Sequence, residues 1–239
     1  MLKHAAKIAA QTLAHRVRKA FSAELRAEQV TPDGSEAART CVEWLRGYIA
    51  KPDARLGRKG DICPFVGTAL ARQRMSFHVY GGVESITGKR LRDVMVDEGL
   101  RLLARLDHAD DDMELTNVNL LFPRCRAADF PSFHEAHTLS KTALMRRGLM
   151  TSVFYPGYTR PGVHNPEFHL YQSPFPIVTI RPMALHDIVF LDRNAYAFAE
   201  YRRRYGQKYA DGKVPKTHGY IERFADAQQR FGTTHATRR

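Results

Sequence analysis

The order in which extended and helical apolar patterns alternate constrains the fold of this chain more than any other feature. Met75 to Tyr80 alternates apolar and polar side chains and is followed by two glycines, which predicts a strand. Further strands are predicted at residues 118–122, 149–155 and 177–180. Helical periodicity predicts helices at residues 2–29, 35–50, 88–107, 130–147, 186–206 and 216–231. This order predicts an α+β fold, with a small central sheet of about four strands and helices packed on it.

The chain is predicted to form one α+β domain at residues 35–239, preceded by a helical extension at residues 1–34. Thr31 to Gly34 reads as the turn between them. The Ala-rich, basic start resembles a mitochondrial presequence, but Glu24 and Glu28 at helical spacing favour an ordinary amphipathic helix. No repeat or low-complexity tract divides the rest, and 239 residues are enough to bury a sizeable core.

Composition and cysteine usage indicate a soluble, cytoplasmic protein. Hydrophobic residues make up 44% and charged residues 26% of the chain, as is usual for globular proteins. No apolar run reaches the ~18 residues that a membrane-spanning helix requires, so no membrane partner is expected. Cys41, Cys63 and Cys125 are few and far apart, which favours neither a disulfide framework nor a zinc site and fits a reducing compartment.

The net charge of +12 is spread along the chain rather than gathered in one segment. Arg202 to Arg204 is the only run of basic residues. A nucleic-acid-binding protein usually concentrates its charge on one face or in a recognised module. A nucleic-acid partner is therefore not expected, whereas an anionic small molecule stays open.

Three side chains are candidate ligands for a metal or a heme iron. His134 and His137 stand at i and i+3 and share one helix face, and a neutral imidazole can bind iron. His164 precedes Asn165-Pro166 in a long connection, where function is often concentrated. The alternatives are half-exposed surface histidines on the helix and simple turn chemistry in the connection.

Cys63-Pro64-Phe65 follows a basic loop, and its thiol is a further candidate ligand. Arg58 and Lys59 would lower the thiol pKa, and a thiolate can ligate heme iron. Arg181 follows the predicted strand at 177–180, where its planar guanidinium could hold a carboxylate or a heme propionate. A buried apolar cysteine and a surface arginine are the alternatives.

Several common catalytic motifs are absent from the sequence. It contains no Gly-x-x-x-x-Gly-Lys-Ser/Thr loop, no Gly-x-Gly-x-x-Gly, no Gly-x-Ser-x-Gly and no Cys-x-x-Cys. This argues against an ordinary NTPase, dehydrogenase, hydrolase or zinc ribbon.

Short motifs in this chain resemble a bacterial family of unassigned function that has a Cys-Pro-Phe motif, often found beside natural-product genes. The resemblance covers about residues 40–235. It rests on Cys63-Pro64-Phe65, Phe154-Tyr155-Pro156, Asn165-Pro166 and Ser173-Pro174-x-Pro176 followed by Ile180-Arg181-x-Met183. That family is distantly similar to the YqcI/YcgG proteins, which include heme-dependent N-hydroxylases acting on arginine and related guanidines.

The resemblance implies a heme-binding protein, specifically a heme-dependent oxygenase or hydroxylase of bacterial secondary metabolism. Its substrate would be a small amino-acid- or guanidine-like molecule, oxidised with O₂ and electrons from a donor. The implied site has His134 or His164 as axial ligand, Cys63 as the thiolate alternative, Arg181 on a propionate or the substrate carboxylate, and Phe65, Phe154 and Tyr155 as walls. The alternatives are a non-catalytic protein that binds heme or another anionic small molecule, and a nucleic-acid-binding protein. The sequence leaves a homodimer open.

Overall fold

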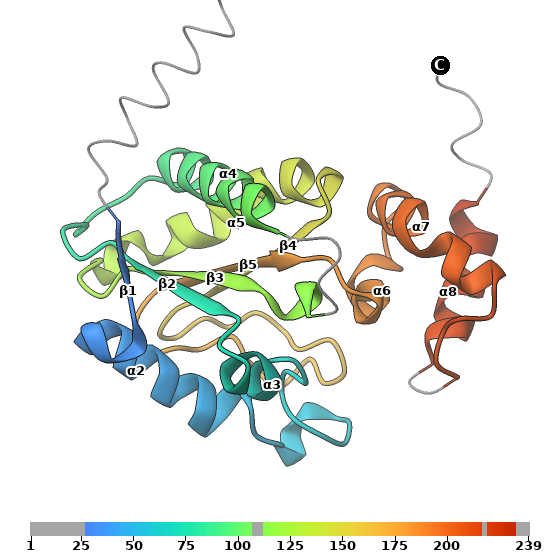
Figure 1. Cartoon of the computed structure of the whole chain (residues 1–239), viewed down its shortest axis with the longest axis horizontal. Helices are drawn as coiled ribbons and strands as arrows, with labels where there is room; N and C mark the ends of the chain where they lie inside the picture. Colours follow the sequence, from blue (N-terminus) through green and yellow to red (C-terminus); the bar gives the residue numbers. More distant parts are fainter. Residues whose placement is uncertain (1–26, 107–111, 217–218, 233–239) are drawn as a thin grey trace, which may run out of the picture.

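One mixed sheet with helices on both faces forms the body of the molecule (Figure 1). The computed structural model describes residues 27–106, 112–216 and 219–232. The strands of the sheet are β1 (Glu28–Val30), β2 (Met75–Val79), β3 (Asn117–Leu121), β4 (Leu149–Phe154) and β5 (Ile177–Pro182). Their order is β1-β2-β3-β5-β4, with β2 and β3 parallel and the other neighbours antiparallel. The predicted α+β fold is confirmed, with one strand more than the sequence predicts.

Seven α-helices occur in the described residues, together with a π-helical turn and several short 3-10 turns. The α-helices are α2 (Glu36–Trp44), α3 (Val66–Ala71), α4 (Gly88–Arg105), α5 (Phe130–Arg146), α6 (Ile188–Leu191), α7 (Ala195–Ala210) and α8 (Tyr220–Phe231). A π-turn at Leu45–Ile49 continues α2. The 3-10 turns are Pro32–Gly34, Ala54–Leu56, Met113–Leu115, Ala127–Asp129 and Leu185–Asp187. None of the helices in the described ranges is long and apolar enough to cross a membrane.

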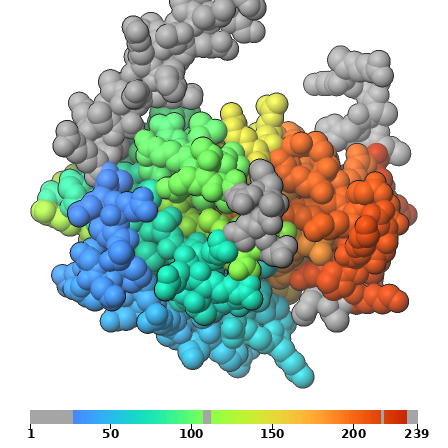
Figure 2. Space-filling model, viewed as in Figure 1, coloured from blue at the N-terminus to red at the C-terminus, as the bar shows by residue number. Residues whose placement is uncertain are grey.

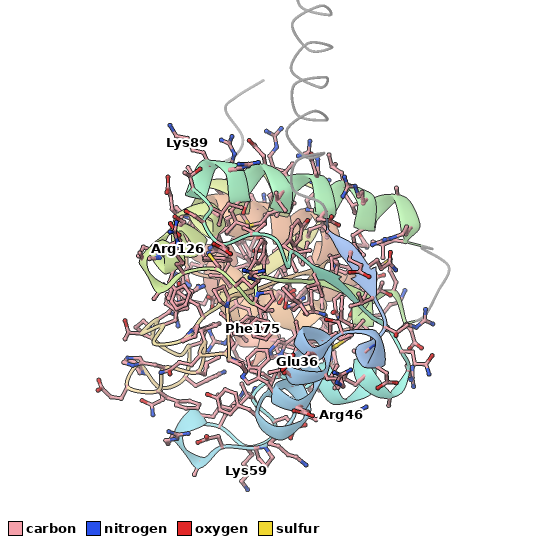
Figure 3. The ribbon with its side chains drawn as sticks, turned by 90° about the vertical axis from the view of Figure 1, so that its left-hand side faces the viewer. Glu36, Arg46, Lys59, Lys89, Arg126 and Phe175 are labelled. Atoms are coloured by element: carbon pink, nitrogen blue, oxygen red, sulfur yellow. The ribbon has the colours of Figure 1, made fainter. Side chains whose placement is uncertain are left out.

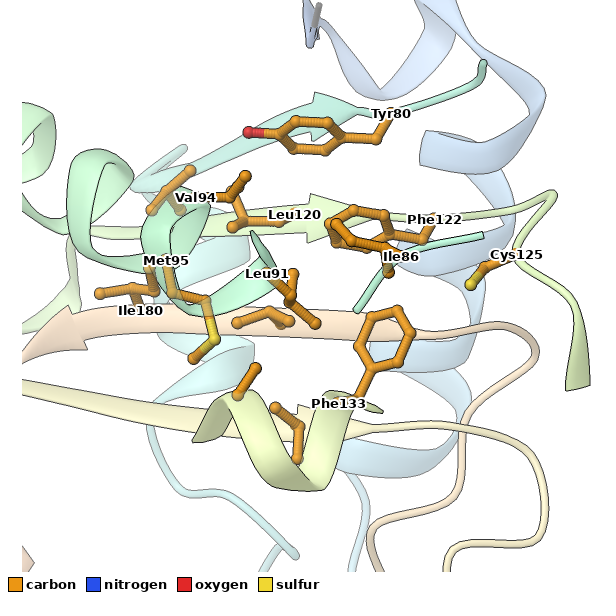
Figure 4. Packing of buried hydrophobic residues seen from close by; sticks show 14 of the residues in the cluster. Tyr80, Ile86, Leu91, Val94, Met95, Leu120, Phe122, Cys125, Phe133 and Ile180 are labelled. Carbon is orange, nitrogen blue, oxygen red and sulfur yellow. The ribbon is translucent and has the colours of Figure 1, made fainter. Parts of the chain in front are cut away.

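The two faces of the sheet are buried by different helices, because strand side chains alternate between faces. α4 and α5 cover one face, where Leu91 and Met95 of α4 pack with Leu120 of β3 and Ile180 of β5 (Figure 4). The opposite face carries Phe77, Leu121 and Ile177, which are buried by α2, its π-turn and α3 (Figure 1). Burying a side chain of this size contributes roughly 1.5–3 kcal/mol.

A third apolar cluster joins α6, α7 and α8 beyond the last residues of β5. Phe198 and Tyr201 of α7 are buried there, and Phe198 contacts Phe224 of α8 at 5.3 Å between ring centroids. In the space-filling view these helices form a lobe on the side of the molecule away from β1 (Figure 2). The C-terminal helices therefore have a small core of their own.

Two predicted helices are wrong in part. Residues 28 and 29, predicted to end the first helix, belong to β1 and pair with β2, whose edge offers unpaired backbone groups. Residues 2–26 of that predicted helix lie outside the described residues. The predicted helix at 186–206 is interrupted between α6 and α7, because the Asn194 side chain caps α7 by accepting from the backbone N–H groups of Tyr196 and Ala197. The sequence also missed the short helix α3.

Candidate functional site

The long connection between β4 and β5, residues 155–176, forms one side of a surface groove. It contains no helix or strand, and loops of this length in a compact domain are usually functional. Between this connection and the π-turn lies an open groove of about 630 Å³. The groove is lined by Trp44, Tyr48, Arg55, Asn165, Glu167, Phe168, His169, Gln172, Ser173 and Pro174.

The π-turn sets the first wall of the groove. Its backbone closes with a hydrogen bond from the Ala50 N–H to the Leu45 carbonyl at 2.8 Å. Leu45 and Ile49 are buried below it, so Trp44 and Tyr48 lie half-buried on the groove side. A π-turn of this kind interrupts regular hydrogen bonding and is frequent at functional sites.

Side chains of α2 and the π-turn bind the backbone of the connection directly. The Trp44 indole N–H donates to the Gln172 carbonyl at 3.1 Å, and the Tyr48 hydroxyl donates to the Leu170 carbonyl at 3.3 Å. These bonds join parts of the chain more than 120 residues apart, separated by 128 and 122 positions. The two walls of the groove are thus held in a fixed relation.

Charged and polar groups lie at one end of the groove. The guanidinium of Arg55 stacks over the Phe168 ring at 4.6 Å and forms an ion pair with Asp53 at 2.7 Å. Asn165 holds this segment in place by donating to the Arg55 carbonyl at 2.7 Å. His169 adds an imidazole to the same groove. Aromatic planes beside a cation and an imidazole suit a flat ligand with an anionic group.

The structure brings Cys63, Phe65 and Arg181 together, but away from the groove. The Arg181 guanidinium stacks over the Phe65 ring at 5.6 Å. It also donates two hydrogen bonds to the fully buried carboxylate of Asp187, at 2.8 and 2.5 Å. Burial opposes the charge of Arg181, but Asp187 outweighs it and raises the arginine pKa above its ordinary value. Arg181 therefore already holds a carboxylate of its own chain.

The prediction that Cys63 has a lowered thiol pKa is wrong. Burial raises its pKa above the ordinary value of 9.0, and the charge of Arg181 offsets only part of this effect. Arg58, which the sequence places close by, instead donates to the carbonyls of Asp61 and Ile62 at 2.8 and 3.0 Å. Cys63 is thus predominantly a neutral thiol at neutral pH.

His134 and Tyr155 belong to another cluster, at the opposite end of β4 and β5. The Tyr158 hydroxyl lies 2.8 Å from His134 Nδ1, and its ring stacks on Tyr155 at 4.2 Å. Phe154, one residue before, contacts Trp44 edge-on at 5.2 Å and so stands behind the groove wall. The predicted site residues therefore do not line a single cavity.

His137 is buried, not half-exposed, and its Nε2 lies 3.1 Å from the Thr151 carbonyl. Burial lowers its pKa to about 4, and the charge of Arg160 acts in the same direction. The described residues contain no group of three or more His, Cys, Asp or Glu side chains that could hold a metal ion. His134 is thus an exposed surface residue, whereas His137 is a buried structural one.

His164 lies in a third place, beside the backbone of Gly57. Gly57 has a φ of +77°, and a Cβ there would lie 3.0 Å from the His164 carbonyl, so only glycine fits this approach. Partial burial, together with the charges of Arg58 and Arg223, lowers the His164 pKa. The exposed His164 does not line the groove.

The basic run Arg202 to Arg204 is engaged within the molecule. Arg203 and Arg204 donate to the Arg146 carbonyl at the end of α5, at 2.9 and 2.6 Å, and both pair with Glu200. Cations at a helix C-terminus complement its unpaired carbonyls and its dipole. The run therefore acts as a helix cap, which weighs against a role in binding nucleic acid.

Sequence reasoning found one wall of the groove and missed the other. The wall at residues 165–174 lies within the connection that the sequence singles out. The wall from Trp44, Tyr48 and Arg55 was not predicted. A signal for it was present: Trp44 is the only tryptophan of the chain, and it falls outside the apolar stripe of its helix.

Comparison with known proteins identifies a family for most of the chain. The sequence model described as "Domain of unknown function (DUF6875)" matches residues 38–216. This agrees with the resemblance to a family of unassigned function, whereas the distant similarity to YqcI/YcgG proteins stays a prediction. No curated protein and no solved structure matches the chain.

Proposed function

This chain belongs to the DUF6875 family, and we propose that it binds a flat, anionic small molecule in the groove between the π-turn and the 155–176 connection. The groove itself carries the proposal. Trp44, Tyr48 and Phe168 offer aromatic surface, and Arg55 and His169 face the same space. Binding sites for small molecules commonly combine such apolar surface with a few placed polar groups.

The arrangement of charges within the groove favours one orientation of the ligand. An anionic group would pair with Arg55, which donates two hydrogen bonds to Asp53 but keeps 68% of its side chain exposed, unlike the more deeply buried Arg181. Glu167, on the same wall, would pair with an amino or guanidinium group. An amino-acid- or guanidine-like substrate would place its cationic group at Glu167, while Arg55 holds the anionic group of the flat ligand.

Heme is the specific ligand that we propose, because the donor set of the groove fits it. His169 would supply an imidazole to the iron, Arg55 would bind a propionate, and Trp44 would pack against the ring. Bound heme would supply oxidation chemistry for an oxygenase or hydroxylase using O₂ and an external electron donor, while this chain binds and orients the reactants. The predicted ligands Cys63, His134 and His164 do not line the groove.

A non-catalytic binding protein is the second candidate function. One observation favours it: the groove is open to solvent, while enzymes of this kind usually exclude water from reactive intermediates. This candidate predicts a bound ligand without turnover. The two candidate functions share the binding site and differ only in whether the bound ligand takes part in catalysis.

Hemin titration of the full chain tests the proposal with two signals. Trp44 is the only tryptophan, so quenching of its fluorescence reports on the groove directly, while the Soret band reports on iron ligation. We expect saturable changes in both. His169→Ala should abolish the ligation-dependent Soret shift, and Arg55→Ala should weaken binding several-fold. His134→Ala, His164→Ala and Cys63→Ala are matched controls and should bind hemin as the parent does.

The same titration can overturn the assignment. A Soret shift that survives His169→Ala but is lost in His134→Ala or His164→Ala would place heme elsewhere. If neither hemin nor a flat aromatic carboxylate quenches Trp44, the groove is not a ligand site of the proposed class. Consumption of O₂ by the hemin-loaded chain, with a reductant and arginine present, separates the oxygenase from the non-catalytic protein.

A further inference from the structure

A second group of polar side chains gathers where α5 meets the start of the 155–176 connection. His134, His137 and Lys141 stand at i, i+3 and i+7 on α5 and therefore share one face of the helix. The hydrogen bond between His134 and Tyr158, 2.8 Å long, fixes the connection against this face. Two residues further on, the guanidinium of Arg160 stacks over the Tyr171 ring at 5.0 Å.

In the described part of the chain, the positive charges of this cluster are not paired with carboxylates. Within the described residues, no Asp or Glu forms an ion pair with Lys141 or Arg160, whereas Arg181 and Arg204 each have a carboxylate partner. Desolvation of its ammonium lowers the pKa of Lys141, and the charge of Arg160 adds to this effect. The two cations therefore repel one another.

The hydrogen bond to Tyr158 also orients the imidazole of His134. Burial raises the Tyr158 pKa, so its hydroxyl stays protonated and can donate to Nδ1 of His134. A neutral imidazole that accepts at Nδ1 carries its hydrogen on Nε2. Because His134 is exposed on the helix, it can present this N–H as a donor.

We infer that His134, Lys141 and Arg160 form a binding site for a small-molecule oxyanion, a carboxylate or a phosphate. Arg160 supplies a planar fork of donors, Lys141 a point charge, and His134 a ring N–H donor, with Tyr158 orienting the imidazole. This oxyanion site is separate from the groove, because none of these residues lines it. The inference does not depend on the proposed heme function.

Anion-dependent stability of the full chain tests the oxyanion site. The Tm is measured with inorganic phosphate, acetate or chloride at equal ionic strength, and calorimetric titration gives the Kd for phosphate and for acetate. We expect phosphate, acetate or both to raise the Tm above the chloride value, because a ligand that binds only the folded state stabilises it. Arg160→Gln and Lys141→Gln should each weaken the binding about tenfold or more, as expected for charge-assisted hydrogen bonds.

Lys89→Gln is the matched control. Lys89 lies exposed on α4, the helix that packs against α5, but it is not one of the residues of the oxyanion site, and its side chain points into solvent (Figure 3). Its substitution removes the same charge and should leave the Kd unchanged. Imidazole NMR signals of His134 should move during the titration in the parent and in Lys89→Gln, and stay still in Arg160→Gln.

Each outcome decides the matter. Binding of phosphate alone assigns the site to phosphorylated ligands, and binding of acetate alone assigns it to carboxylates. A Tm in chloride equal to the Tm in phosphate and acetate would show general ionic screening and would overturn the site. A Kd that is unchanged in both Arg160→Gln and Lys141→Gln would overturn it as well. If Arg160→Gln does not fold, the exposed Lys141→Gln variant still answers the question.

Discussion

Breaking the Arg181–Asp187 pair should destabilise the protein without affecting the groove. Asp187 is fully buried and accepts two hydrogen bonds from Arg181 and one from the Ala184 N–H, at 2.8 Å. Asp187→Asn keeps the shape of the side chain but removes the charge opposite the guanidinium. Removing one partner of a buried ion pair costs about 3–5 kcal/mol.

The structure places the expected loss at the lower end of this range. The Arg181 side chain retains 20% exposure, so water can partly solvate the guanidinium once Asp187 is neutral. We therefore expect a loss of about 3 kcal/mol in the free energy of unfolding. For a chain of this size, that corresponds to a fall in Tm of about 6–12 °C.

Urea denaturation followed by circular dichroism measures this loss, and a double variant provides the control. Arg181→Met combined with Asp187→Leu removes both charges together and should recover much of the stability, because no unpaired charge is then left buried. Hemin binding by the folded variants should be unchanged. A loss below about 1 kcal/mol would refute the reasoning, as would a double variant that is less stable than Asp187→Asn. Weaker hemin binding at unchanged stability would indicate that Arg181 binds a heme propionate or a substrate carboxylate, as predicted from the sequence.

Three further predictions concern packing, acid stability and thiol reactivity. Gly99→Ala places a Cβ 2.6 Å from a Leu144 methyl group and should cost about 1–3 kcal/mol in thermal unfolding, whereas Gly47→Ala meets no atom within 4 Å and should be neutral or slightly stabilising. Burial opposes the charge of Glu98, but its imidazole partner and its hydrogen bonds outweigh it and hold the Glu98 pKa below its ordinary 4.5. The stability that this carboxylate contributes is present above pH 4.5 and is lost as the pH falls further. Glu98→Gln should therefore flatten the decline in the urea midpoint between pH 5 and 3. An equally steep decline in Glu98→Gln and in the parent would contradict this. Since burial raises its pKa, Cys63 should react with iodoacetamide at pH 7.5 at least about tenfold more slowly than in urea-unfolded protein, and equal rates would show that the thiol is activated after all.

The candidate site shows where sequence reasoning stopped. The residues predicted as one heme pocket are divided among three places, since β5 runs between them. Phe154 pairs with Ile177 at one end of this strand, whereas Arg181 lies four residues further along, at about 3.4 Å per residue. Neighbouring motifs in the sequence can therefore lie at opposite ends of the same strand.

The sequence by itself determined the class of fold and the segments of regular structure. Residues 75–80 alternate, and residues 88–107 repeat at helical spacing, because burial of one face imposes that period on the residues of the element itself. The same local reasoning could not see β1, because a three-residue strand depends on the free edge of β2 for its hydrogen bonds.

Only the tertiary structure decided which side chains meet. Trp44 faces Gln172 across 128 positions, and Arg181 is paired with Asp187 and so is not available to a ligand. Such contacts depend on how the helices, strands and loops pack together, and the periodicity within one element does not show which other element it contacts. Charges follow the same rule: Cys63 lies near basic residues in the sequence, yet burial decides its pKa. Local pattern fixes the elements, whereas long-range packing fixes the electrostatics and the shape of the groove.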